Sequence, residues 1–159
     1  MVDNAESNTG PQASPPALLE APGFLVRRLY QAYVSAWVRG VDSSLTGPQF
    51  AVLTAVGARP GRDQRSMASA VSLDTSTMTD IVRRMEKRGL ISRQTPVTDA
   101  RRKLLYLTPE GESMLEHANR LARQLDERLL RPYGALERDE LITTLTQLAD
   151  HWETVPQEF

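Results

Sequence analysis

The chain has 159 residues, a net charge of −1 and 40% hydrophobic residues, values typical of one soluble globular domain. The absence of cysteine excludes disulfides and thiol redox sensing, and two histidines far apart in sequence, His117 and His151, exclude a clustered transition-metal site. No apolar run is long enough to span a bilayer and the N-terminus lacks the order of a secretory signal, so we expect a cytoplasmic protein with no membrane partner and no cofactor.

The charge is distributed unevenly along the chain. Residues 81–103 hold eight basic and two acidic side chains, whereas residues 104–159 hold five basic and eleven acidic ones. A dense basic block in an otherwise acidic protein is either a solvated surface or the electrostatic footprint of phosphate binding. Charge alone leaves both interpretations open.

The first 17 residues are polar and rich in proline and show no apolar periodicity, so we expect them to form a flexible arm. Residues 18–159 are expected to form a single domain. Its first predicted helix extends from Gly23 to Val41, where apolar residues recur along one side of a helical wheel. That apolar side needs a partner to cover it.

Three shorter helices follow, each opened by an N-cap signal. Thr46 and Gln49 have the spacing of a capping box, Asp63 is a candidate N-cap, and Asp74 or Thr75 caps the third helix. The last two of these helices, joined by a tight turn, make a helix-turn-helix. The three predicted helices cover about residues 47–58, 64–71 and 75–88.

The third of these helices has one apolar and one polar face. Four apolar residues follow the i, i+3, i+4, i+7 spacing and must face inward: Met78, Ile81, Val82 and Met85. The outward face is polar and mostly basic, with Ser76, Asp80, Arg83 and Lys87, and Thr79 beside them.

The apolar pattern changes after Gly89. Residues 90–93 and 103–107 predict two short strands around a segment at 96–102 that contains two arginines. The sequence therefore predicts a β-hairpin with a basic tip.

Two further helices complete the chain. Thr108, Pro109 and Glu110 supply an N-cap, a first-turn proline and an acid on the helix dipole, and Pro132 and Gly134 end the helix that they open. The last predicted helix has a seam of apolar residues to bury, formed by Leu141, Leu145, Leu148 and Trp152.

This order of elements is that of a winged helix-turn-helix flanked at both ends by helices with surplus apolar faces. From about Leu18 to Trp152 the chain resembles the MarR (multiple antibiotic resistance regulator) family, most specifically at residues 80–91 and at the wing signature, residues 99–111. The resemblance implies a mainly α fold with a small β-hairpin wing. The implied parts are a winged helix-turn-helix at about 46–108 and N- and C-terminal dimerisation helices at about 18–42 and 109–155.

The resemblance also implies a homodimer on a pseudo-palindromic operator in double-stranded DNA. The helix from about Thr75 would enter the major groove, and Arg101 of the wing would enter the minor groove, oriented by Asp99. Such a placement agrees with how side chains recognise base edges and groove width. The predicted DNA-binding residues are Arg65, Thr75, Ser76, Thr77, Thr79, Arg83, Arg84, Lys87, Arg93, Asp99, Arg101, Arg102 and Lys103.

Two positions depart from the family pattern. Ala100 stands where the family usually has another arginine, and Arg83 stands at a commonly acidic place, which puts the internal salt bridge of that place in question. On an ordinary helix, the same basic residues would only form a solvated face.

Residues 21–31 resemble the first helix of members that control aromatic-acid catabolism. The resemblance implies a repressor released by a small aromatic carboxylate or an aromatic acyl-CoA thioester, with arginines pairing with its anionic groups and aromatic side chains supplying surface. The predicted effector-binding residues are Phe24, Arg27, Arg28, Gln31, Tyr33 and Trp37. Alternatively, the two arginines are surface residues or contact the DNA backbone, and Trp37 and Trp152 pack at the dimer seam.

Other functions remain as alternatives. A MarR-type regulator could answer to lipophilic phenols or drugs, and an architectural DNA binder without an effector would show weak sequence preference and no release by ligand. An enzyme has little support, because the sequence has no nucleophile elbow, no glycine-rich phosphate loop and no paired histidines. We therefore expect a transcriptional regulator that is not an enzyme.

Overall fold

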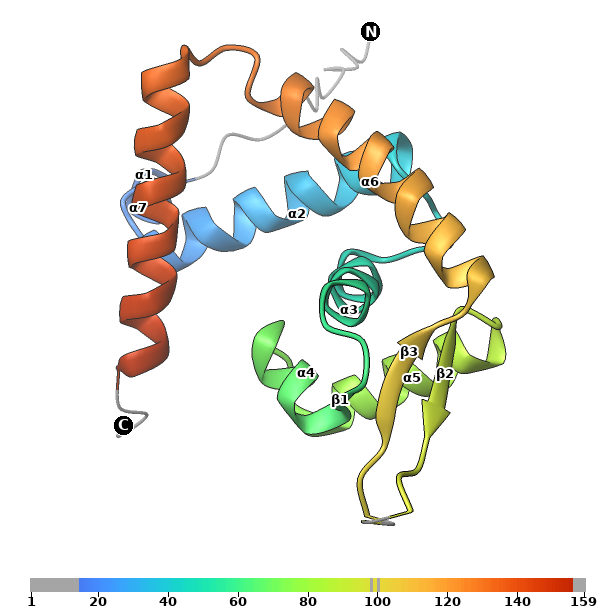
Figure 1. Ribbon diagram of the computed structural model, residues 1–159. Helices are drawn as coiled ribbons and strands as arrows, with labels where there is room; N and C mark the ends of the chain where they lie inside the picture. Colours follow the sequence, from blue (N-terminus) through green and yellow to red (C-terminus); the bar gives the residue numbers. More distant parts are fainter. Residues whose placement is uncertain (1–14, 98, 100, 156–159) are drawn as a thin grey trace, which may run out of the picture. The chain divides into compact units, whose positions relative to one another are not determined.

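The computed structural model describes residues 15–97, 99 and 101–155. The chain divides into two compact units, one ending at Ala36 and one beginning at Trp37, and each is described by itself. The elements in chain order are α1 (Pro16–Leu19), α2 (Pro22–Gly40), α3 (Gly47–Ala58), β1 (Arg62–Asp63), α4 (Gln64–Ala70), α5 (Thr75–Lys87), β2 (Ile91–Gln94), β3 (Leu104–Leu107), α6 (Pro109–Leu129) and α7 (Ala135–Thr154) (Figure 1).

The first unit contains the short helix α1 and most of α2. Helix α2 begins one residue before the predicted start and ends one residue before the predicted end. Several large apolar side chains along it are exposed, among them Leu25, Leu29 and Tyr30. The surplus apolar face expected for this helix is therefore present. The boundary expected after residue 17 stays a prediction, and residues 1–14 of the arm lie outside the described residues.

The predicted N-caps of the helix-turn-helix region are confirmed. The Thr46 amide donates to Oε1 of Gln49 at 3.0 Å, and the Gln49 amide donates to Oγ1 of Thr46 at 3.4 Å, which completes the capping box of α3. Asp63 accepts the Ser66 amide at 3.0 Å at the start of α4. Of the two alternatives for α5, the N-cap is Asp74.

The wing is a three-stranded antiparallel sheet in the order β1-β3-β2. Strands β2 and β3 form the predicted hairpin, with Ile91 opposite Leu107. The additional strand β1 pairs Arg62 with Leu105. It was not predicted, because two residues carry no periodicity. At the tip, Thr98 and the unusual Ala100 lie outside the described residues.

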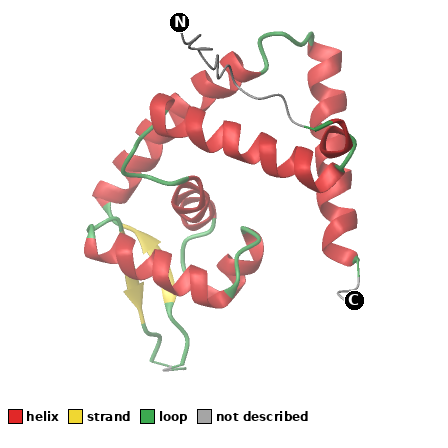
Figure 2. Cartoon of the chain, turned by 180° about the vertical axis from the view of Figure 1, so that it is seen from behind, coloured by secondary structure: helices red, strands yellow, loops and turns green. Residues whose placement is uncertain are grey.

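Helix α3 lies between α6 on one side and the α4–α5 pair on the other, and it contacts all three helices and β3 (Figure 2). Its core side chains include Val52, Leu53 and Val56, none of them accessible to solvent. The four inward residues predicted on α5 are all buried, the most exposed being Ile81 at 8%. This core holds the helix-turn-helix rigidly against the wing.

Helix α6 is fixed at its start by two close contacts. Thr108 caps it by accepting the Gly111 amide at 3.0 Å, and any Cβ on Gly111 would overlap the carbonyl oxygen of Leu90. Glycine at this position therefore lets α6 lie directly against the chain segment that follows α5. Helix α7, by contrast, contains no buried residue.

No helix among the described residues is both long and apolar enough to cross a membrane.

Candidate nucleic-acid interface

Helix α5 presents the polar face that the sequence predicts. Most of its predicted DNA-binding side chains are exposed, namely Thr75, Ser76, Thr79, Arg83, Arg84 and Lys87, while Thr77 is half-buried. Arg65 is exposed on α4. An exposed helix with hydroxyl groups at its N-terminal end and cations further along has the shape and chemistry to enter a major groove.

The N-terminus of α5 is organised by Asp74. The hydroxyl groups of Ser76 and Thr77 each donate to this carboxylate at 2.5 Å, and the Thr77 amide donates at 2.9 Å. Together these hydrogen bonds hold the pKa of Asp74 far below its usual range, and the two hydroxyl groups have the largest effect. The carboxylate is therefore ionised at neutral pH and fixes both hydroxyl groups at the end of α5.

A polar contact joins the two helices of the helix-turn-helix. Nε2 of Gln64, at the start of α4, donates to Oγ1 of Thr79 at 2.8 Å, and that hydroxyl donates to the Thr75 carbonyl, also at 2.8 Å. Gln64 was not among the predicted site residues, because a single polar residue at a helix start gives no signal of a partner fifteen positions away.

Arg83 has an acidic neighbour despite its unusual position in the family pattern. Its guanidinium lies 2.8 Å from Oδ1 of Asp80, one turn earlier on the same helix. The side chains of both residues are more than half exposed, at 66% and 54%. Such an exposed pair contributes little to stability, so Arg83 can exchange this partner for a phosphate or a base.

Three basic residues of the wing have partners within the chain. Arg93 of β2 forms an ion pair with Glu86 of α5, and the Arg102 guanidinium lies 3.4 Å from Oδ2 of Asp63, the N-cap of α4. Nζ of Lys103 donates to Oγ1 of Thr95 at 2.7 Å. The first two contacts tie the wing to the helix-turn-helix.

Arg101 differs from these three residues. Its backbone amide donates to Oδ1 of Asp99 at 3.0 Å, so Asp99 orients the main chain at the wing tip. Its exposed guanidinium makes no hydrogen bond or ion pair with another residue of the described ranges. Of the four basic residues predicted to bind DNA from the hairpin, Arg101 is the one whose side chain has no partner among the described residues.

The predicted effector residues of the first unit lie along α2. Phe24 and Tyr33 are half-buried, and Arg27, Arg28 and Gln31 are exposed. The Arg27 guanidinium lies 5.2 Å from the centroid of the Phe24 ring, a cation–π distance.

Trp37, at the start of the second unit, is only 2% exposed. Its indole N–H donates to the Leu45 carbonyl at 2.6 Å, and its ring lies 5.0 Å from that of Phe50. The aromatic surface expected from Trp37 is therefore not exposed, because the ring packs in the core of its own chain.

A hollow of about 450 Å³ between α3 and α4 was not predicted from the sequence. Its walls are mainly apolar and include Phe50, Met67 and Val71, with Thr54 and Arg59 as polar lining residues. A stripe of small residues on α3, at 51, 54, 55 and 58, leaves this space open. The i, i+3, i+4, i+7 spacing of these small residues is a signal that could have indicated it.

The model of the MarR family matches residues 45–103, from just before α3 to the residue before β3. The transcriptional regulator HosA of Escherichia coli O157:H7 is 34% identical over 122 residues, which cover 77% of this chain and 89% of HosA. The chain belongs to the MarR family.

Solved structures of other MarR-type regulators have the same fold. PcaV from Streptomyces coelicolor, in complex with its natural ligand, is 36% identical with a TM-score of 0.82 over 87% of this chain and 98% of PcaV. The repressor CouR bound to a 23-mer DNA duplex is 28% identical with a TM-score of 0.79 over 87% of this chain and 99% of CouR. CouR has also been solved with p-coumaroyl-CoA, an aromatic acyl thioester.

This MarR chain is therefore a winged-helix transcriptional regulator and not an enzyme, as its relatives are DNA-binding regulators. The resemblance to members connected with aromatic acids is confirmed by the same comparisons.

Proposed function

We propose that this regulator is a homodimeric repressor that binds a pseudo-palindromic operator and is released by a small aromatic carboxylate or its CoA thioester. In each subunit, α5 enters the major groove and Arg101 enters the adjacent minor groove. The single observation that carries the DNA-binding part is the contrast within the wing: Arg93 and Arg102 hold the wing on the helix-turn-helix, while the Arg101 side chain stays exposed beyond them.

Dimerisation is supported by the apolar side chains that the single chain leaves exposed. Helix α7 exposes Ile142, Leu145, Leu148 and Trp152, each by 39% or more, and α2 adds an apolar face of its own. Contiguous exposed apolar surface is unusual on a monomeric protein. A second copy related by a two-fold axis would cover both faces with equivalent ones.

The effector part is supported by the hollow between α3 and α4. Its volume of about 450 Å³ is within the range of small-molecule sites, which are mostly apolar with a few polar groups. Arg59 offers a guanidinium for a carboxylate and Thr54 offers a hydroxyl group. Arg27 and Arg28 belong to the other unit and stay a separate prediction from the sequence. CouR is a relative that has been solved with p-coumaroyl-CoA bound.

The proposal is tested by selecting DNA from a random library and measuring affinity by fluorescence anisotropy, with and without benzoate, p-coumarate and p-coumaroyl-CoA. We expect two half-sites about one helical turn apart, and an affinity loss of about 5- to 150-fold with one of these ligands. Selection of a single half-site contradicts the dimer. Release by lipophilic phenols alone favours the alternative effector class, and weak preference without any release identifies an architectural DNA binder.

A further inference from the structure

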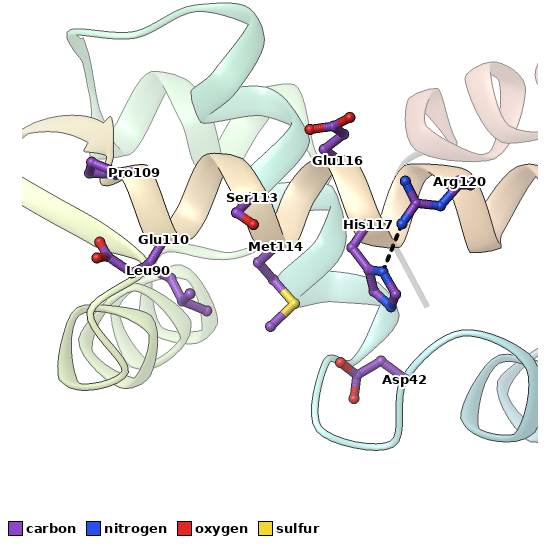
Figure 3. A pocket seen from close by; sticks show the side chains of 9 residues that line it. All are labelled: Asp42, Leu90, Pro109, Glu110, Ser113, Met114, Glu116, His117 and Arg120. Carbon is purple, nitrogen blue, oxygen red and sulfur yellow. Dashed lines mark hydrogen bonds between the residues drawn. The ribbon is translucent and has the colours of Figure 1, made fainter.

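A second hollow, of about 820 Å³, lies in the unit that begins at Trp37 (Figure 3). It is formed by the first half of α6, by Leu90 after α5 and by the loop after α2. None of its lining residues lines the hollow between α3 and α4. It is therefore a separate site, and the proposed function gives it no role.

The lining of this second hollow is acidic. It contains three carboxylates, those of Asp42, Glu110 and Glu116, and only one guanidinium, that of Arg120. Nη2 of Arg120 lies 3.0 Å from Nδ1 of His117. Because a guanidinium can only donate, Nδ1 is the acceptor in this contact. With the imidazole counted as neutral, the lining has a formal charge of −2.

Asp42 is a fixed anion at one side of the hollow. Its Oδ1 accepts the Ser44 amide at 2.5 Å, and Arg88, the C-cap of α5, donates to the Ser44 carbonyl at 2.7 Å. Burial raises the pKa of Asp42, but the Ser44 hydrogen bonds and the charge of Arg88 outweigh burial and lower the pKa on balance. In the close view, Asp42 lies across the hollow from His117 (Figure 3).

The rest of the lining supplies apolar surface. Met114 is half-buried on α6, and Leu90 is 5% exposed beneath the start of that helix. In the close view both side chains extend from the backbone on the same side of α6 as Asp42 (Figure 3). A methionine side chain adapts its shape readily to a flat apolar group.

We propose that this hollow is a second small-molecule site, for an organic cation with an apolar body. The cationic group lies near Asp42 and the body lies on Met114 and Leu90. An organic anion is disfavoured, because the lining as a whole holds three carboxylates and only one guanidinium, which already donates to His117. The site adjoins the C-terminal end of the recognition helix through Arg88 and Ser44.

The two hollows can be observed separately, because each has its own methionine: Met114 here and Met67 between α3 and α4. The experiment is NMR of the full-length protein labelled with ¹³C at its methionine methyl groups, assigned with Met114→Leu and Met67→Leu. The cationic probe is benzyltrimethylammonium, with benzyl alcohol as a neutral control and benzoate as an anionic control. We expect a saturable shift of the Met114 signal with the cation and no shift of Met67.

Asp42→Asn keeps the acceptor for the Ser44 amide but removes the charge, and we expect it to weaken binding of the cation about three- to tenfold. Asp139→Asn, which removes the same charge from an exposed position on α7, should leave the affinity unchanged. Added salt should weaken binding of the cation by the unaltered protein, which tests the charge without any substitution.

The proposal is overturned if Met114 does not respond, if benzyl alcohol or benzoate shifts it as strongly as the cation, or if neither salt nor Asp42→Asn changes the affinity. The Met67 signal reports on the hollow between α3 and α4, and the Met114 signal reports on this one. The experiment therefore distinguishes a failure of the effector proposal from a failure of the cation-site proposal.

Discussion

Gln64 of α4 and Thr79 of α5 are joined by a hydrogen bond of 2.8 Å between Nε2 and Oγ1. The same hydroxyl donates to the Thr75 carbonyl within α5, so the bond fixes the position of α4 against the first turns of the recognition helix. It is a direct polar link between the two helices of the helix-turn-helix.

Replacing Gln64 by alanine should therefore affect DNA binding as well as folding. We expect Gln64→Ala to lower the free energy of unfolding by about 0.5–1.5 kcal/mol, the net value of one hydrogen bond, and to lower operator affinity because α5 loses its fixed orientation. Urea unfolding and anisotropy measure the two effects. Gln124→Ala, at an exposed position of α6, is the control and should change neither. Equal operator affinity for both variants would show that the bond does not orient α5.

The wing arginines should separate into one that contacts DNA and one that positions the wing. Arg101→Ala should weaken operator binding by about 1–3 kcal/mol and leave the unfolding midpoint unchanged, because its guanidinium has no partner within the described ranges. Arg102→Ala and Asp63→Asn should each weaken binding, and the double variant should be no worse than the stronger single one, because both remove the same contact. Unaltered operator affinity in Arg101→Ala would end the proposed role of the wing.

The apolar seam of α7 should determine the oligomeric state. Leu145→Asp places a charge among exposed apolar side chains, and we expect a monomer in sedimentation at micromolar concentration. Thr143→Asp adds the same charge elsewhere on the helical wheel and should leave the dimer intact. Finding the unaltered protein monomeric, or the Leu145 variant still dimeric, would exclude this seam as the interface.

The N-cap of α5 predicts a pH dependence of stability. The pKa of Asp74 in the folded chain lies below its ordinary value of 3.8, so the stabilisation from its charge is complete above that value and is lost as the pH falls towards the folded pKa. Asp74→Asn, which keeps an N-cap side chain without the charge, should be less stable than the unaltered protein at pH 7. The difference between their urea midpoints should shrink below about pH 4. A difference that stays constant from pH 7 to pH 2.5 would contradict this assignment.

Local signals in the sequence predicted most of the fold. The capping residues Thr46, Asp63 and Thr108 act on amides three positions away, and the apolar face of α5 repeats within four turns of helix. Such features depend on neighbouring residues and are visible in the sequence. The polar face of α5 was predicted for the same reason, since burial of one side of a helix exposes the other.

Only the tertiary structure decided which side chains remain available to bind a partner outside the chain. Strand β1 has two residues and exists because it pairs with β3, more than forty residues later, and the sequence contains no local trace of that pairing. The charge pattern alone does not distinguish Arg93, Arg101 and Arg102, yet Glu86 and Asp63 bind the first and the last. Trp37 lies on the apolar side of the predicted helix, which fits either a ligand site or packing, and its contacts with Leu45 and Phe50 place it in the core of its own chain. Partners outside the same helix or strand determine each of these outcomes, because contact energies depend on proximity in space, which only the folded chain establishes.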